Sequence, residues 1–168
     1  MNKDEIYSFL ETRQIPFERM EHIAVFNMAE MRQVQLTHPE AEAKNLFVRD
    51  DKKRNYYLIT VRGDKRVDLK QFQAANGTRR LSFASDEDLM TILSLIPGAV
   101  TPLGLLNDTE RKVHFYLDEA FFDEPQLIGL HPNDNTATIW LKTDDLIRII
   151  RDHGNPVTAV QIGNSSGE

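Results

Sequence analysis

The stretch from residue 127 to residue 140 constrains the fold more than any other part of the chain. An apolar run, Leu127-Ile128-Gly129-Leu130, leads into His131-Pro132, a polar turn follows at 133–135, and an alternating run begins at Thr136. This order predicts a strand, a tight loop and a second strand, with a histidine at the lip of the loop. Gly129 lacks a Cβ and permits a close approach to its backbone, and Pro132 biases His131 towards an extended conformation. The stretch is either a hairpin whose loop happens to contain a histidine or the wall of a small pocket.

Other segments alternate between helical and extended patterns. Apolar spacing and capping residues predict helices over 4–13, over 28–34 with Asn27 as N-cap, over 68–75, over 86–95 with Ser85 as cap, and over 146–153 after a Thr143-Asp144-Asp145 cap. Further strands are predicted at 45–49, 56–61, 81–84, 112–117 and 157–161, with an edge or irregular strand at 100–106 because it contains Pro102. We therefore expect an α+β fold. It comprises a single domain over 1–163, with a mixed, barrel-like β-sheet and flanking helices, and a disordered tail at 164–168.

Composition excludes several kinds of chemistry. The chain has no cysteine, which rules out disulfides, thiol nucleophiles and Cys-ligated zinc. The five histidines show no metal-ligand spacing, and neither a nucleophile-elbow serine motif nor a phosphate-binding Gly-rich loop is present. An enzyme of this sequence would rely on positioned water and backbone dipoles, so we expect no metal and no cofactor. No apolar run approaches the roughly 20 residues that span a membrane, and we expect a cytoplasmic protein.

The charge is unevenly distributed. The formal net charge is -6, yet residues 44–80 hold eleven Lys/Arg against four Asp/Glu. A basic segment inside an acidic chain can form a local phosphate-binding face. The alternative is a pair of solvated hairpin loops, at 51–54 and at 63–66.

Two further places can carry chemistry. Lys44 precedes an apolar strand, where a compact cation can reach a phosphate or a carbonyl oxygen. The segment 97–102, which contains Gly98, places free amides at a turn after a helix, and such amides can stabilise a developing oxyanion. A solvated strand end and an ordinary helix stop are the alternatives.

Together these pieces resemble a known family. The stretches that carry the resemblance occur in order along residues 5–160: His22-Ile23-Ala24-Val25-Phe26, Lys44-Asn45-Leu46-Phe47-Val48-Arg49-Asp50, Val67-Asp68-Leu69-Lys70, Arg80-Leu81-Ser82-Phe83-Ala84-Ser85, Pro97-Gly98-Ala99-Val100-Thr101-Pro102-Leu103-Gly104-Leu105 and His131-Pro132-Asn133-Asp134-Asn135. The ordered set resembles the prolyl-tRNA editing family, the YbaK/ProX group, and within it the free-standing Ala-tRNA(Pro) deacylases.

The resemblance implies a hydrolase that removes alanine from mischarged tRNA(Pro) in trans. Binding the acceptor end of tRNA(Pro) is implied, and whether prolyl-tRNA synthetase or an elongation factor assists stays open. The implied catalytic positions are Lys44, Gly98, Ala99 and Gly129. The implied substrate-binding positions are Asn45, Arg80, Thr101 and His131. In these roles Lys44 positions the terminal adenosine and its ester, the turn amides meet the reacting carbonyl or water, and His131 shapes the pocket or orients the substrate.

Two departures from the family pattern concern specificity. Asn27 stands where a threonine is expected, and the linker 38–43 lacks a glycine before the lysine. Both departures are expected near the pocket mouth. Hydrolysis of Cys-tRNA(Pro) is the neighbouring alternative, and a non-catalytic tRNA-binding module of the same fold is the alternative from another class. The presence of Lys44 and both glycine turns favours an active enzyme.

Overall fold

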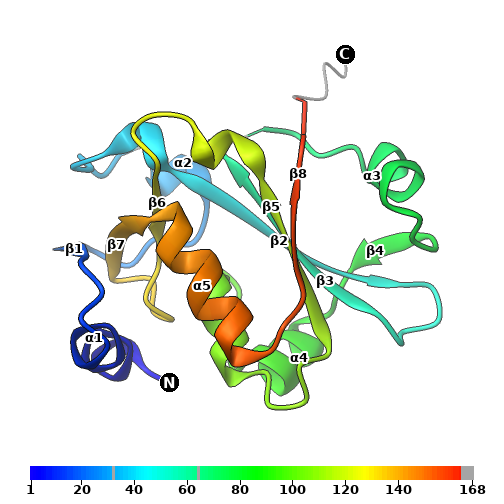
Figure 1. Ribbon diagram of the computed structural model, residues 1–168, viewed down its shortest axis with the longest axis horizontal. Helices are drawn as coiled ribbons and strands as arrows, with labels where there is room; N and C mark the ends of the chain where they lie inside the picture. Colours follow the sequence, from blue (N-terminus) through cyan, green and yellow to red (C-terminus); the bar gives the residue numbers. More distant parts are fainter. Residues whose placement is uncertain (32, 64, 164–168) are drawn as a thin grey trace.

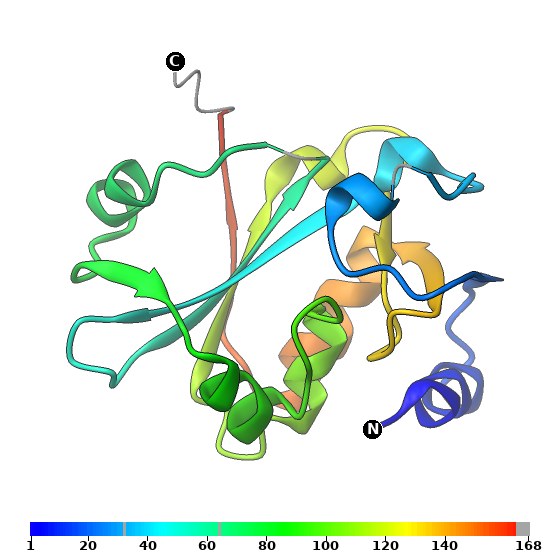
Figure 2. The same ribbon diagram turned by 180° about the vertical axis from the view of Figure 1, so that it is seen from behind.

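The computed structural model describes residues 1–31, 33–63 and 65–163 (Figures 1 and 2). The predicted tail at 164–168 lies outside the described residues. The helices are α1 (Lys3–Thr12), α2 (Met28–Met31), η1 (Pro39–Ala41), α3 (Leu69–Asn76), α4 (Asp86–Asp88), η2 (Leu89–Leu93), η3 (Pro102–Asn107), η4 (Glu119–Phe122) and α5 (Thr143–His153). The strands are β1 (Glu18–Glu21), β2 (Ala43–Asp50), β3 (Tyr56–Arg62), β4 (Leu81–Phe83), β5 (Val113–Asp118), β6 (Leu127–Leu130), β7 (Ala137–Lys142) and β8 (Val157–Val160).

The strands form two sheets. One has the order β4-β2-β3-β5-β8 and is mixed: β2 runs antiparallel to β3 and β4, whereas β3, β5 and β8 are parallel. The other is antiparallel with the order β1-β7-β6. The predicted α+β fold with a mixed sheet is confirmed, but the single sheet that we expected is divided in two. The β6–β7 hairpin pairs with β1 instead of extending the larger sheet.

The main core joins both sheets to α1 and α5. Leu146, Ile149 and Ile150 of α5 are buried at helical spacing and pack with Phe115 of β5. A smaller apolar cluster lies under α3, where the ring of Phe72 meets Tyr116 edge to face with centroids 4.9 Å apart. Figures 1 and 2 both place α1 and α3 at opposite ends of the molecule. Within the ranges described, no helix is long and apolar enough to cross a bilayer.

Two predictions about extended segments were wrong or incomplete. The strand expected at 100–106 is instead η3, because the Thr101 side chain accepts a hydrogen bond from the Leu103 amide and Pro102 supplies a first helical residue with a fixed φ. β1 was not predicted at all. Its residues are mostly exposed and show no alternation, so only the pairing of Glu18–Glu21 with β7 reveals it.

The helix ends confirm some predicted caps and correct others. Ser85 and Asp88 form the expected capping box, but only three α-helical residues follow before the chain continues as the π-helical turn η2. Thr143 is inside α5 and caps nothing; its hydroxyl donates to the carbonyl of Phe121 at 2.7 Å. The Asn27 side chain accepts from the Glu30 amide at 2.8 Å, as an N-cap should.

Candidate active site

A pocket of about 200 Å³ lies where the start of β2, the end of β6 and the segment around α2 meet. It gathers residues far apart in the sequence, because the two sheets bring the first residues of β2 beside the β6–β7 hairpin. The lining residues are Val25, Phe26, Asn27, Met31, Leu36, Glu42, Ala43, Lys44, Asn45, Gly98, Val100, Gly129, Leu130, His131 and Thr138. Five of the eight predicted site residues therefore meet in one place: Lys44, Asn45, Gly98, Gly129 and His131.

Lys44 is a half-buried cation at the pocket. It pairs with Val61 in the β2–β3 ladder, and its Nζ lies 3.4 Å from the carbonyl oxygen of Lys65. Over the described ranges, no carboxylate lies within 4.0 Å of this ammonium group. The ammonium group of Lys44 therefore lies on the pocket wall, where a ligand can reach it.

Asn45 holds the pocket together through its side-chain amide. Its Nδ2 donates to the carbonyl of Val100 at 3.1 Å, and its Oδ1 accepts from the buried hydroxyl of Thr60 at 2.6 Å. The amide thus ties β2 to β3 and to the 97–102 turn. Asn45 lines the pocket as predicted, but its hydrogen bonds in this structure are to the protein itself.

Gly98 makes the 97–102 turn possible. Its φ is +89°, and a Cβ there would lie 3.1 Å from both the Cα and the ring of Phe26. The structure does not bring the two other residues predicted in this turn to the pocket. Ala99 is buried and its amide donates to Ile96, and Thr101 is fully buried as the cap of η3. The amide of Ala99 is engaged and cannot serve as an oxyanion donor here.

Gly129 permits a close approach, as the sequence predicts, but the group that approaches is the indole of Trp140. A Cβ at Gly129 would lie 2.9 Å from Trp140 Nε1 and 3.3 Å from the carbonyl oxygen of Ala41 in η1. The two residues are direct partners across β6 and β7. Because Gly129 has no side chain, Trp140 and η1 can pack directly against β6 next to the pocket.

His131 presents a fixed imidazole to the pocket. Its Nδ1 lies 2.9 Å from the carbonyl oxygen of Ala137, and because a carbonyl only accepts, Nδ1 carries the hydrogen and Nε2 is the acceptor in the neutral ring. Burial lowers the pKa of His131, the Ala137 carbonyl opposes this, and the neighbouring His22 lowers it further. The neutral ring, with Nε2 as its acceptor, is thus the favoured form.

The loop after His131 braces the opposite pocket wall. Asn135 exchanges two bonds with Val25, its Nδ2 donating to the Val25 carbonyl at 2.9 Å and its carbonyl accepting from the Val25 amide at 3.2 Å. His22 bonds the hydroxyl of Thr138 through Nε2 at 2.9 Å. Sequence reasoning missed Val25 and Thr138 as pocket residues. Their only signal was membership of a short apolar segment and of an alternating strand.

Arg80 does not reach the pocket. It is exposed just before β4, beside Arg79, which forms a two-pronged ion pair with Asp51 at 2.6 and 3.1 Å. This basic end of the molecule contains the β2–β3 turn, and about 3.3 Å per strand residue places it some 20 Å along β2 from Lys44. Arg80 and Lys44 can therefore contact only different parts of a large ligand.

The chain is similar in sequence to proteins of one family. Residues 22–149 match the model of the family described as "Aminoacyl-tRNA editing domain". The chain is 35% identical to "Prolyl-tRNA editing protein ProX" of Acetoanaerobium sticklandii, over 95% of this chain and 97% of that protein. It is 33% identical to "Prolyl-tRNA synthetase associated domain-containing protein 1" of Mus musculus, over 92% and 95% of the two chains.

The fold has solved counterparts. A crystal structure of "a putative trans-editing enzyme for prolyl tRNA synthetase" superimposes with a TM-score of 0.74, covering 97% of each chain at 21% identity. At that identity the likeness concerns the fold alone. The matched segment begins at His22 and ends in α5, so it contains every residue that lines the pocket. The chain belongs to the aminoacyl-tRNA editing domain family.

Proposed function

We propose that this protein is a trans-editing deacylase that hydrolyses the ester bond of Ala-tRNA(Pro). The observation that carries the proposal is the pocket that joins the Lys44 ammonium, the Gly98 turn and the His131 imidazole. The family and the ProX relative supply the substrate class, an aminoacyl-tRNA. An enzyme that edits in trans acts after the synthetase has released its product.

The size of the pocket suits a small amino acid. Its volume is about 200 Å³, and apolar side chains such as Val25, Met31 and Leu130 form much of its wall. Binding alone separates small apolar side chains poorly, so a second, hydrolytic site that admits alanine and excludes proline by shape adds the missing selectivity. Asn27, which stands where the family pattern has a threonine, lines this same pocket and is placed to influence the choice between alanine and cysteine.

Lys44 is the natural anchor for the substrate. An ammonium group on the pocket wall attracts the phosphates of the acceptor end and the polar atoms of the ester. His131 adds a lone pair at Nε2 that can accept a hydrogen bond from the substrate or from water. These groups hold the ester and a water molecule in line, which is the main requirement for an ester that is already activated.

The reaction needs no covalent intermediate with the protein. The oxygen of water bonds to the carbonyl carbon, the bond from that carbon to the ribose oxygen breaks, and a proton from the water ends on the ribose oxygen. The products are free alanine and tRNA(Pro). The hydroxyl next to the ester on the terminal ribose is our candidate for guiding the attacking water, because the sequence shows none of the usual motifs of a nucleophile with its base. A tRNA with a hydrogen in place of that hydroxyl should be cleaved far more slowly, and full activity on it would reject this route.

Deacylation assays with two lysine variants test the proposal. Wild type, Lys44→Ala and Lys53→Ala are compared on Ala-tRNA(Pro), Cys-tRNA(Pro) and Pro-tRNA(Pro). Lys53 is exposed in the β2–β3 turn and controls for the loss of a positive charge outside the pocket. We expect loss of alanine release in Lys44→Ala only. Faster cleavage of Cys-tRNA(Pro) than of Ala-tRNA(Pro) would keep the reaction and change the substrate to Cys-tRNA(Pro). Binding of tRNA without cleavage of any ester would favour the non-catalytic tRNA-binding module.

A further inference from the structure

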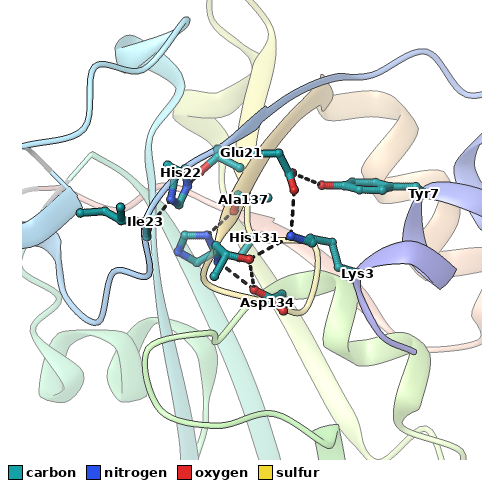
Figure 3. A network of polar contacts seen from close by, with 10 residues as sticks. Lys3, Tyr7, Glu21, His22, Ile23, His131, Asp134 and Ala137 are labelled. Atoms are coloured by element: carbon teal, nitrogen blue, oxygen red, sulfur yellow. Dashed lines mark hydrogen bonds and ion pairs between the residues drawn. The ribbon is translucent and has the colours of Figure 1, made fainter.

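A chain of polar contacts connects the N-terminal helix to the wall of the pocket (Figure 3). Lys3 of α1 donates from Nζ to Glu21 Oε1 of β1 at 2.8 Å and to the hydroxyl oxygen of Thr136 at 2.9 Å. Thr136 stands at the end of the loop that begins with His131. One ammonium group thus reaches from α1 across β1 to the loop that carries a pocket residue.

Thr136 is the hub of this chain. Its amide donates to Asp134 Oδ1 at 2.8 Å, its hydroxyl donates to the same oxygen, and its carbonyl accepts from the amide of His22 at 2.9 Å. Hydrogen bonds from Thr136 lower the pKa of Asp134 despite an opposing contribution from burial, and the positive charge of Lys3 lowers it further. Asp134 is therefore an anion that Lys3 partly neutralises.

Several charged or titratable groups surround the His131 ring. Asp134 lies in its own loop, and the ring of His22 meets it edge to face with centroids 6.2 Å apart. Glu42, which follows η1, and Lys44 of β2 line the same pocket. Asp134 and His22 are both joined to α1 through Thr136 and Lys3, and Asp134 is the one of the two that carries a negative charge beside the imidazole.

We propose that Lys3 is a positioning residue for the His131 wall of the pocket, acting through Thr136 and Asp134. This inference rests on the proposed function for its kinetic consequences. Lys3 lies on α1, which precedes the segment 22–149 that matches the family model. Its ammonium group holds the loop against β1 and balances the Asp134 carboxylate beside the imidazole.

Tyr7 provides the matched control. Its hydroxyl donates to Glu21 Oε2 at 2.8 Å, so it too links α1 to β1 by one hydrogen bond to Glu21, but in the described part of the chain no hydrogen bond joins it to residues 131–136. Lys3→Met and Tyr7→Phe each remove one such link and retain most of the side chain's apolar bulk. If Lys3 only docked the helix, the two variants would behave alike.

NMR titration of the His131 imidazole gives a readout that does not depend on activity. In Lys3→Met the carboxylate of Asp134 loses its cation, so we expect the pKa of His131 to rise. Tyr7→Phe should leave it unchanged, Lys3→Arg should restore the wild-type value, and Lys3→Met should have no effect in an Asp134→Asn background. A His131→Gln spectrum assigns the signal among the five histidines.

Kinetics on Ala-tRNA(Pro) complete the test. Because neutral His131 is the form that accepts a hydrogen bond, a raised pKa moves the acid limb of the rate profile to higher pH. We expect Lys3→Met to lose roughly threefold to tenfold in kcat near neutrality, within the range by which mutations along a coupled network affect a distant site. If Lys3→Met matches Tyr7→Phe in both the titration and the pH profile, the inference is wrong. If wild type cleaves no ester, the proposed function fails while the titration still decides the coupling.

Discussion

Of the glycines that stand in turns, Gly98 is the one whose replacement by alanine should damage the pocket most. The residue has a φ of +89°, and the new Cβ would lie 3.1 Å from the backbone Cα of Phe26, which cannot rotate away. Gly77 offers a matched control. Its φ is +67°, and no atom lies within 4 Å of its added Cβ.

The magnitude follows from separating two costs. Left-handed backbone costs an L-residue about 1–2 kcal/mol, and this applies to both variants. Crowding against Phe26 adds about 1–3 kcal/mol for Gly98→Ala only. The gain from a stiffer unfolded chain is common to both and cancels. The difference of about 1–3 kcal/mol corresponds to roughly 2–12 °C in Tm for a chain of this size.

Urea unfolding and thermal unfolding of the two variants measure this difference, and the deacylation assay shows where it acts. Gly98→Ala should lower both stability and alanine release, whereas Gly77→Ala should lower stability alone and by less. Equal destabilisation of the two variants, or full activity in Gly98→Ala, would refute the argument that this turn must sit against Phe26.

Three further predictions concern single contacts. Gly129→Ala should lower the free energy of unfolding by about 1–3 kcal/mol, because the added Cβ would lie 2.9 Å from Trp140 Nε1. It should also shift the fluorescence of Trp140, the chain's single tryptophan, and an unchanged emission spectrum would count against this contact. Asn45→Ala should destabilise the protein by about 2–4 kcal/mol, since it leaves the Thr60 hydroxyl and the Val100 carbonyl without their partner, and urea unfolding measures it. Burial acts to raise the pKa of Asp50, but hydrogen bonds from the Arg54 amide and from Asn55 outweigh burial, so the pKa of Asp50 lies below its ordinary value. The stability that ionised Asp50 contributes is therefore present above the unfolded pKa of about 3.9. It is lost as the pH falls through the pKa of the folded state. Asp50→Asn should therefore unfold with a weaker pH dependence below pH 4, and an unaltered dependence would contradict the assignment.

Much of the fold was visible in the sequence where local pattern and tertiary packing agree. The β6–β7 hairpin, the Ser85 capping box and the end of α5 at Gly154 all follow from short-range chemistry, and all occur where predicted. β1 was invisible because its four residues gain order only from pairing with β7. The strand expected at 100–106 failed because Pro102 after a capping threonine suits the start of a helix as well as a sheet edge.

The candidate site was predicted in part for a similar reason. Lys44, Gly98, Gly129 and His131 stand at strand ends or turns, where sequence signals are strong, and the structure brings them to one pocket. Ala99 and Thr101 share a motif with Gly98, but neighbours in sequence on a tight turn point in different directions, and these two are buried. The link from Lys3 to the His131 loop joins residues 133 positions apart, and no local pattern could indicate it.

The most direct test of the central claim is the single-turnover rate of wild-type protein on Ala-tRNA(Pro) beside Pro-tRNA(Pro), with both charged on the same tRNA. An editing pocket of this size should release alanine rapidly and leave the prolyl ester intact. Equal rates on the two esters would contradict selection by the pocket, and failure to cleave either ester while tRNA still binds would contradict the proposed reaction itself.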